Sequence, residues 1–344
     1  MELVLHIGGA KTGTSSIQKA LHLNRKHLLD NGILYPRCLG FDRHSLLAIP
    51  YSNGRVPREF WQKLGRGDKA LAKARKAWRD FGRQVEKHKP RKIILSGEQL
   101  LNTRDHEGFR QAILDAAGTP KTTVVCYLRN PYDLYPSLLQ QAIKASHRLP
   151  QTVYVPYSPR IEAFAPFGEV VLREFDRDLL AEGDAVTDFV RSYVGVELDD
   201  VPSSTNIGLS PEGTAILQAF RKDFFPEVNN VSNRETKDFI KAIRKAEADL
   251  GGKNYFGKPK LKPGVRAAIA AAAAPDIAML KDAFGFQFSR NDRLHAGEIR
   301  PFKYHGALRV QDVLEIDQDR LQMLYRRILL DIMRPPSEAG QADT

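Results

Sequence analysis

The sequence predicts an α/β fold of three layers, in which helices cover both faces of a mainly parallel central sheet, with a helical elaboration at the C-terminal end. Over residues 1–205, short apolar runs alternate with helical patterns, which is typical of parallel sheets. After residue 205 only helical patterns follow. The 344 residues can bury a large core. We therefore expect a single domain over 1–344, with an α/β core at 1–205, helices at 206–334 and a frayed tail at 335–344.

Five apolar runs are the candidate strands, and each is bounded by turn residues or by a helical pattern. The first, ELVLHI, ends in two glycines. The segment after it, SSIQKALHLNRKHLLDNG, has helical spacing and ends at Gly32, a good C-cap residue. A later helix, AVTDFVRSYVGV, is expected to end near Gly195. The five predicted strands are 2–7, 33–36, 91–98, 122–131 and 169–176.

Residues 55–92 carry 14 Lys and Arg against four Asp and Glu, an excess of +10 in a chain whose formal charge is +11. In their centre, DKALAKARKAWRDFGRQVEKH, apolar residues recur every three or four positions, which predicts an amphipathic helix with a basic outer face. This face fits an anionic partner such as an acidic polysaccharide or glycolipid, and a merely solvated face is the alternative. Aromatic residues are sparse there and no nucleic-acid motif accompanies them, so we expect no nucleic-acid partner.

The sequence also indicates the cellular compartment in which the protein is found. It has no run of about 18 apolar residues, so no membrane span is predicted. The N-terminus lacks the basic start and the cleavage site of an export signal. Cys38 and Cys126 lie far apart and fit a reducing compartment. We expect a cytoplasmic protein, and nothing in the sequence indicates its oligomeric state.

Residues 8–16, GGAKTGTSS, lie between the first predicted strand and its helix. A loop of this kind binds phosphate, because its backbone N–H groups converge and the helix N-terminus adds a positive dipole end. Gly8, Gly13 and Ser15 match the Walker A spacing, but Thr14 stands at the lysine position and the lysine is Lys11. No strand closed by Asp supplies a Walker B acid. A magnesium-dependent kinase would therefore lack two of its parts.

The segment HIGGAKTGTSSIQ resembles the 5′-phosphosulfate loop of P-loop sulfotransferases that use 3′-phosphoadenosine 5′-phosphosulfate (PAPS). The resemblance implies a P-loop fold with Lys11 beside the bridging oxygen of the leaving group. It also implies that the 5′ phosphate and sulfuryl group are cradled by Thr12, Gly13, Thr14, Ser15 and Ser16. A Gly- and Ser-rich turn that binds no ligand is the alternative.

A second motif is VVCYLRNPYDLYPSLLQQ, in which Arg129 ends a predicted strand and Ser137 follows eight residues later in a helix. A guanidinium suits a phosphate dianion, and a serine hydroxyl can donate one more hydrogen bond. The segment resembles the 3′-phosphate motif of the same family. The resemblance implies that Arg129 and Ser137 bind the 3′ phosphate that distinguishes PAPS from ATP. A salt-bridged arginine and a helix-capping serine are the alternative.

Sulfuryl transfer needs an acceptor hydroxyl in line with the sulfur, a positive field on the leaving phosphate and a general base. Family members place a His or Glu near the end of the third strand, where Glu98 lies, and strand ends of this kind face the ligand crevice. Glu98 is therefore our candidate base, with helix capping or pairing with Arg104 as the alternative. His44 is the second candidate, and His6 is expected to pack in the core. No metal is required, since Lys11 and the loop N–H groups supply the positive field.

The resemblance covers residues 1–20 and 122–141 well, is weaker over VVLREFDRDLLAEGDAVTDFV and is loose after residue 205. It implies a PAPS-dependent sulfotransferase that acts by in-line displacement on a hydroxyl of a carbohydrate or glycolipid. The lack of a predicted membrane anchor resembles the bacterial members. The alternatives are a P-loop kinase and a non-catalytic module that binds nucleotide or polyanion. The sequence specifies neither the acceptor nor the sulfated position.

Overall fold

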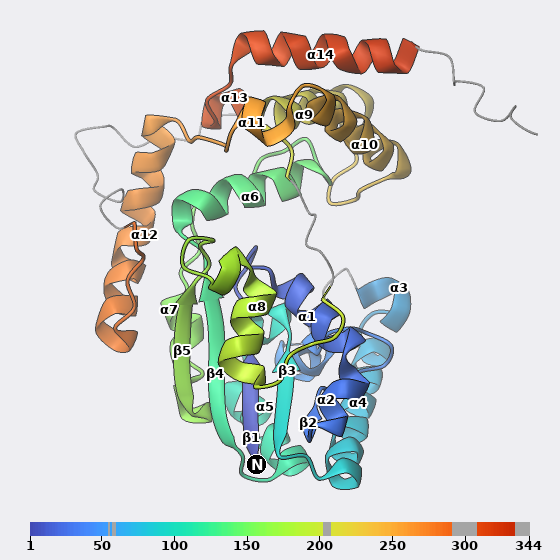
Figure 1. Ribbon diagram of the computed structural model, residues 1–344, viewed down its shortest axis with the longest axis vertical. Helices are drawn as coiled ribbons and strands as arrows, with labels where there is room; N and C mark the ends of the chain where they lie inside the picture. The colour runs from blue at the N-terminus through green and yellow to red at the C-terminus, as the bar shows by residue number, and fades with distance from the viewer. Residues whose placement is uncertain (54–55, 57–59, 202–207, 291–307, 334–344) are drawn as a thin grey trace, which may run out of the picture. The chain divides into compact units, whose positions relative to one another are not determined.

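The computed structural model describes residues 1–53, 56, 60–201, 208–290 and 308–333 (Figure 1). The described residues of 1–130, 156–205 and 274–291 form one compact unit, and those of 131–155, 206–273 and 292–344 form a second. The division of the chain at residue 205 stays a prediction. Residues 131–155, which we assigned to the α/β core, group with the later helices instead. The expected tail at 335–344 lies outside the described residues.

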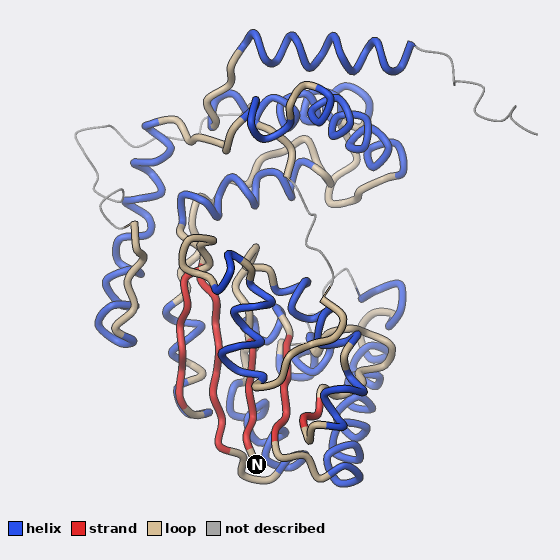
Figure 2. Tube along the Cα trace, viewed as in Figure 1, coloured by secondary structure: helices blue, strands red, loops and turns tan. Residues whose placement is uncertain are grey.

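The first unit contains a five-stranded, all-parallel sheet with the order β2-β3-β1-β4-β5, which confirms the predicted α/β class (Figure 2). β1 lies in the centre, and its last residue, His6, is in register with Ser96 of β3 and Val125 of β4. The second strand is shorter than expected. The strands are β1 (Glu2–His6), β2 (Ile33–Leu34), β3 (Lys92–Ser96), β4 (Lys121–Leu128) and β5 (Glu169–Glu174).

Helices cover both faces of this sheet, because the strands are apolar on both sides. On one face, α1 (Thr14–Leu23), α2 (Arg25–Asp30) and α8 (Ala185–Phe189) share a buried cluster with alternate strand residues such as Val4 and Val125. The predicted end near Gly195 is confirmed, since one π turn (Val190–Val194) continues α8 to that glycine at φ 83°. On the other face, α4 (Asp68–His88) packs against α5 (His106–Ala117), with Trp78 and Phe109 in edge contact.

The helix expected after the glycine loop is divided in two at Asn24. The Asn24 amide donates to the carbonyls of Ala20 and Asp200, and its Oδ1 accepts from the amides of Asp199 and Asp200. This buried side chain therefore ends α1 and holds the segment at 199–200 against it. Gly32 has φ 73° just after α2, as its predicted place at a helix end requires.

Short elements complete the first unit, and two of them flank the end of β3. They are η1 (Ser45–Tyr51), α3 (Trp61–Leu64), η3 (Glu98–Asn102), α7 (Ser158–Glu162), η4 (Ala165–Phe167) and η5 (Ala181–Gly183). η1 packs on α4, α5 and η3. These contacts hold the chain that surrounds the carboxyl end of β3.

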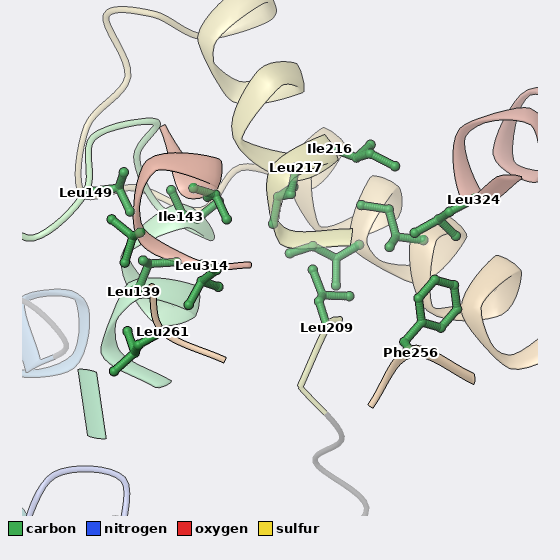
Figure 3. Close-up of a cluster of buried hydrophobic side chains, with 14 of the residues drawn as sticks. Leu139, Ile143, Leu149, Leu209, Ile216, Leu217, Phe256, Leu261, Leu314 and Leu324 are labelled. Carbon is green, nitrogen blue, oxygen red and sulfur yellow. The ribbon is translucent and has the colours of Figure 1, made fainter. Parts of the chain in front are cut away.

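The second unit is helical and has its own core, part of which is shown in Figure 3. In residues 208–273 and 308–333 no strand is present, only the isolated bridge between Leu261 and Leu314, as expected for the region after residue 205. Its helices are α6 (Pro131–Ile143), α9 (Pro211–Phe224), α10 (Arg234–Asp249), α11 (Gly252–Phe256), α13 (Val310–Val313) and α14 (Gln318–Met333).

α12 (Pro263–Phe284) contains the boundary between the units and continues through Pro275. Of the described helices, it alone has the length and apolar composition to cross a membrane, and 39% of its most apolar window is buried. Within it, the buried Asp276 carboxylate accepts hydrogen bonds from the amides of Tyr157 and Ser158. The absence of a membrane span stays a prediction.

Candidate functional site

The glycine loop leaves the carboxyl end of the central strand and enters α1 directly. The Ile7 amide donates to the Val125 carbonyl at 3.0 Å, which holds the start of the loop against β4. Gly8, Lys11 and Gly13 all have positive φ, at 57°, 61° and 76°. Gly13 is the N-cap of α1, and no described side chain caps this helix. A left-handed conformation is uncommon for a residue other than glycine.

Threonine hydroxyls stabilise this loop from inside. Thr12 Oγ1 donates to the Gly9 carbonyl at 2.8 Å and lies 3.3 Å from Thr14 Oγ1. Both threonines are buried, whereas Ser15 is exposed and Ser16 is half-buried. Of the five residues predicted to cradle phosphate, the two threonines therefore use their hydroxyls within the loop. Backbone N–H groups and the two serine hydroxyls are the groups that a ligand would meet.

Arg129 follows β4 and contacts the loop. Its Nη1 donates to the Lys11 carbonyl at 3.0 Å, and its guanidinium lies over the Phe175 ring at 5.6 Å from the centroid. The hydrogen bond anchors the one loop residue that is left-handed without being glycine. The guanidinium predicted to bind a 3′ phosphate thus also positions the loop, which the sequence did not indicate.

Glu98 lies at the end of β3, exposed and close to both the loop and Lys11. A Cβ built on Gly8 would lie 3.7 Å from the Glu98 Cα. Burial lowers the pKa of the Lys11 ammonium, the Glu98 charge opposes this and the Arg129 charge adds to it. The structure therefore brings together three predicted site residues, Lys11, Glu98 and Arg129, at the carboxyl edge of the sheet.

His44, the second candidate base, is fully buried and holds two segments together. Its Nδ1 accepts from the Ser96 amide and its Nε2 lies 2.9 Å from the Pro36 carbonyl oxygen. Burial lowers the His44 pKa to about 4. Both ring nitrogens are engaged, so the structure gives His44 a structural position rather than one from which it could meet an acceptor. His6 is buried in the core, as expected, with Nδ1 2.9 Å from Ser96 Oγ.

Ser137 lies half-buried in the second turn of α6, which begins two residues after Arg129. α6 belongs to the second unit, whereas Arg129 belongs to the first. The pairing of these two residues on one phosphate stays a prediction.

Phe175 is a residue that sequence reasoning missed. It follows β5, its amide donates to the Leu128 carbonyl at 2.7 Å, and its ring would lie 3.2 Å from a Cβ on Gly13. Nothing distinguishes this phenylalanine in EVVLREFD. The available signal was its position, since the residues that follow parallel strands gather at one edge of the sheet. Lys11, Glu98, Arg129 and Phe175 follow four strands at that edge.

A substitution at Gly9 tests how closely the loop meets the sheet. A Cβ at Gly9 would lie 2.2 Å from the Tyr127 carbonyl oxygen, so Gly9→Ala must displace backbone and is expected to destabilise the protein by about 2 kcal/mol or more. Gly82→Ala in α4 is the control, because its Cβ would meet Ala116 at an ordinary 3.7 Å. That change should stabilise the helix by about 0.5–1 kcal/mol. Thermal melting that shows equal effects of both changes would contradict the close approach.

This edge of the sheet gathers groups of the kind that attract anions. A helix N-terminus without a side-chain cap, a lysine and an arginine lie around one loop, and one carboxylate stands beside them. β1 and β4 are neighbours whose connections leave in opposite directions, to β2 and to β5, and ligands bind at such a switch point in open parallel sheets. No family model, curated protein or solved structure matches the chain.

Proposed function

We propose that this protein is a PAPS-dependent sulfotransferase that moves a sulfuryl group to an acceptor hydroxyl, with a carbohydrate or glycolipid as the acceptor class. The observation that carries the proposal is the bond from Arg129 to the carbonyl of the left-handed Lys11, in a loop that opens α1. It links the glycine loop to the arginine of the second motif within one unit, as a shared nucleotide would require.

The loop suits a leaving phosphate better than a Mg·ATP complex. The lysine stands inside the loop and not at its end, so its ammonium would neutralise charge on the bridging oxygen of the 5′ phosphate. The acceptor oxygen would attack sulfur from the opposite side, its proton would pass to a base, and the S–O bond to 3′,5′-ADP would break. Glu98 is the base that we assign, since it is exposed and near Lys11. His44 is disfavoured by its burial.

A thermal shift assay with 3′,5′-ADP, 5′-ADP and Mg·ATP in parallel tests the donor site. We expect 3′,5′-ADP to stabilise the protein most. At 100 times its Kd, a ligand contributes about 2.7 kcal/mol, which is several degrees of Tm for a protein of this size.

The comparison among the three ligands decides between the candidate functions. A shift with Mg·ATP and none with 3′,5′-ADP would sink the sulfotransferase proposal and favour a kinase. Binding of 3′,5′-ADP without any turnover of PAPS over a panel of saccharides and glycolipids would favour the non-catalytic module.

A further inference from the structure

The outer face of α4 carries a row of cations. We call the six exposed residues Lys69, Lys73, Lys76, Arg79, Arg83 and Lys87 the α4 basic face. At 1.5 Å per residue the row is about 27 Å long, and steps of seven residues from Lys69 to Lys76 to Arg83 space its cations by about 10 Å. The row is rigid, because the opposite side of α4 is anchored by buried Ala74, Trp78 and Phe81.

Few carboxylates neutralise this face. Arg83 lies 3.3 Å from Asp80, and Lys73 Nζ donates to the Lys63 carbonyl. For Lys69, Lys76 and Arg79, no carboxylate of the described chain lies within ion-pair distance. A row of cations with so few carboxylates beside it is costly in self-repulsion, and an anionic partner relieves that repulsion.

The chemistry of the face decides which polyanion fits. Ala72 is the only apolar side chain that α4 exposes, so nothing on this face could insert into a lipid surface. No aromatic side chain on it could stack a base. One side of α4 is packed against η1 and α5, so only the cationic outer side of the helix is offered to a partner. What remains is a linear polymer recognised through its charges.

We propose that the α4 basic face binds an acidic polysaccharide lengthwise. This inference rests on the proposed function in one respect, that the bound polymer is the acceptor for sulfuryl transfer. α4 leads into β3, so its N-terminal end lies toward the carboxyl edge of the sheet, where Lys11 and Glu98 lie. A polymer along α4 would therefore run toward the site within the same unit.

Binding of fluorescent heparin by the full-length protein over a range of salt concentrations tests the proposal. The triple variant Lys76→Gln, Arg79→Gln and Arg83→Gln should bind heparin at least about ten-fold more weakly. Its slope of log Kd against log salt should fall by about two, since each lost contact removes about 0.7 for a linear polyanion. The matched control is Lys237→Gln, Lys241→Gln and Lys245→Gln, three exposed lysines of α10, and should stay within two-fold of the parent.

Three outcomes would overturn the inference. They are unchanged heparin binding by the α4 variant, an equal loss in the α10 control, and tighter binding of duplex DNA or phosphatidylserine vesicles than of heparin through the same residues. The shift with 3′,5′-ADP is measured on the same preparations. If the α4 variant loses heparin binding and the parent protein does not bind 3′,5′-ADP, the polysaccharide-binding surface is supported and the proposed reaction is refuted.

Discussion

Replacing Lys11 with alanine is expected to lower kcat for sulfuryl transfer by about 10²–10³-fold, the usual effect of removing one preorganised positive group from a reacting oxyanion. Alanine keeps the Cβ, and Arg129 bonds to the backbone carbonyl of residue 11, so the loop should keep its conformation. The measurement is the release of 3′,5′-ADP from PAPS over a panel of saccharide acceptors, with Tm recorded for each variant.

Lys19→Ala is the matched control, because Lys19 is an exposed lysine of α1. It should leave both kcat and Tm unchanged. In the same assay, Glu98→Gln should lower kcat by about 10²-fold or more if the carboxylate is the base. Glu98→Gln should also lower the Lys11 pKa further, because the Glu98 charge partly offsets the lowering that burial causes. Turnover by Lys11→Ala within three-fold of the parent would refute the mechanism, and near-native turnover by Glu98→Gln would leave solvent as the base.

Replacing Arg129 with alanine should weaken the binding of both 5′-ADP and 3′,5′-ADP. If Arg129 met only a 3′ phosphate, 3′,5′-ADP would lose affinity while 5′-ADP bound as before. Arg129 Nη1 also donates a hydrogen bond to the Lys11 carbonyl. We therefore expect the affinity for 5′-ADP to fall about ten-fold and the affinity for 3′,5′-ADP to fall about 100-fold. Titration calorimetry with both nucleotides measures the two losses.

Arg110→Ala is the control for Arg129→Ala. Arg110 is an exposed arginine of α5 that likewise donates to a backbone carbonyl, that of Pro166, at 3.0 Å. Arg110→Ala should leave the affinities for 5′-ADP and 3′,5′-ADP unchanged. If Arg129→Ala binds 5′-ADP with unaltered affinity, Arg129 does not position the loop, and its only role is contact with the 3′ phosphate.

Much of the fold follows from local sequence patterns. Apolar runs on both sides of a strand require two covering layers, and this places β1, β3, β4 and β5 in a buried parallel sheet. The 21-residue helix α4 follows from apolar residues at helical spacing, which alone define its buried face. The break of the first predicted helix was missed, because it depends on hydrogen bonds between the Asn24 side chain and the backbone of residues 199 and 200, far away in the sequence.

Part of the candidate site could likewise be found from the sequence, and part of it only from the structure. The glycine loop, its displaced lysine and the arginine after β4 could be found from residue types and spacing, since a phosphate loop needs glycine at fixed positions beside a helix N-terminus. The candidacy of His44 could be assessed only with coordinates, because a histidine in sequence shows neither its burial nor the two groups at its ring nitrogens.

The sequence by itself determined the fold class, the glycine loop with its displaced lysine and the basic face of α4, because each depends on neighbours within a few residues. Only the tertiary structure decided that Arg129 holds the Lys11 carbonyl, that Phe175 lies beside Gly13 and that the threonine hydroxyls turn inward to Gly9. The first two of these contacts join segments more than 100 residues apart, and the direction of a hydroxyl depends on the folded loop. Their partners are set by the order of strands in the sheet, which no local pattern encodes.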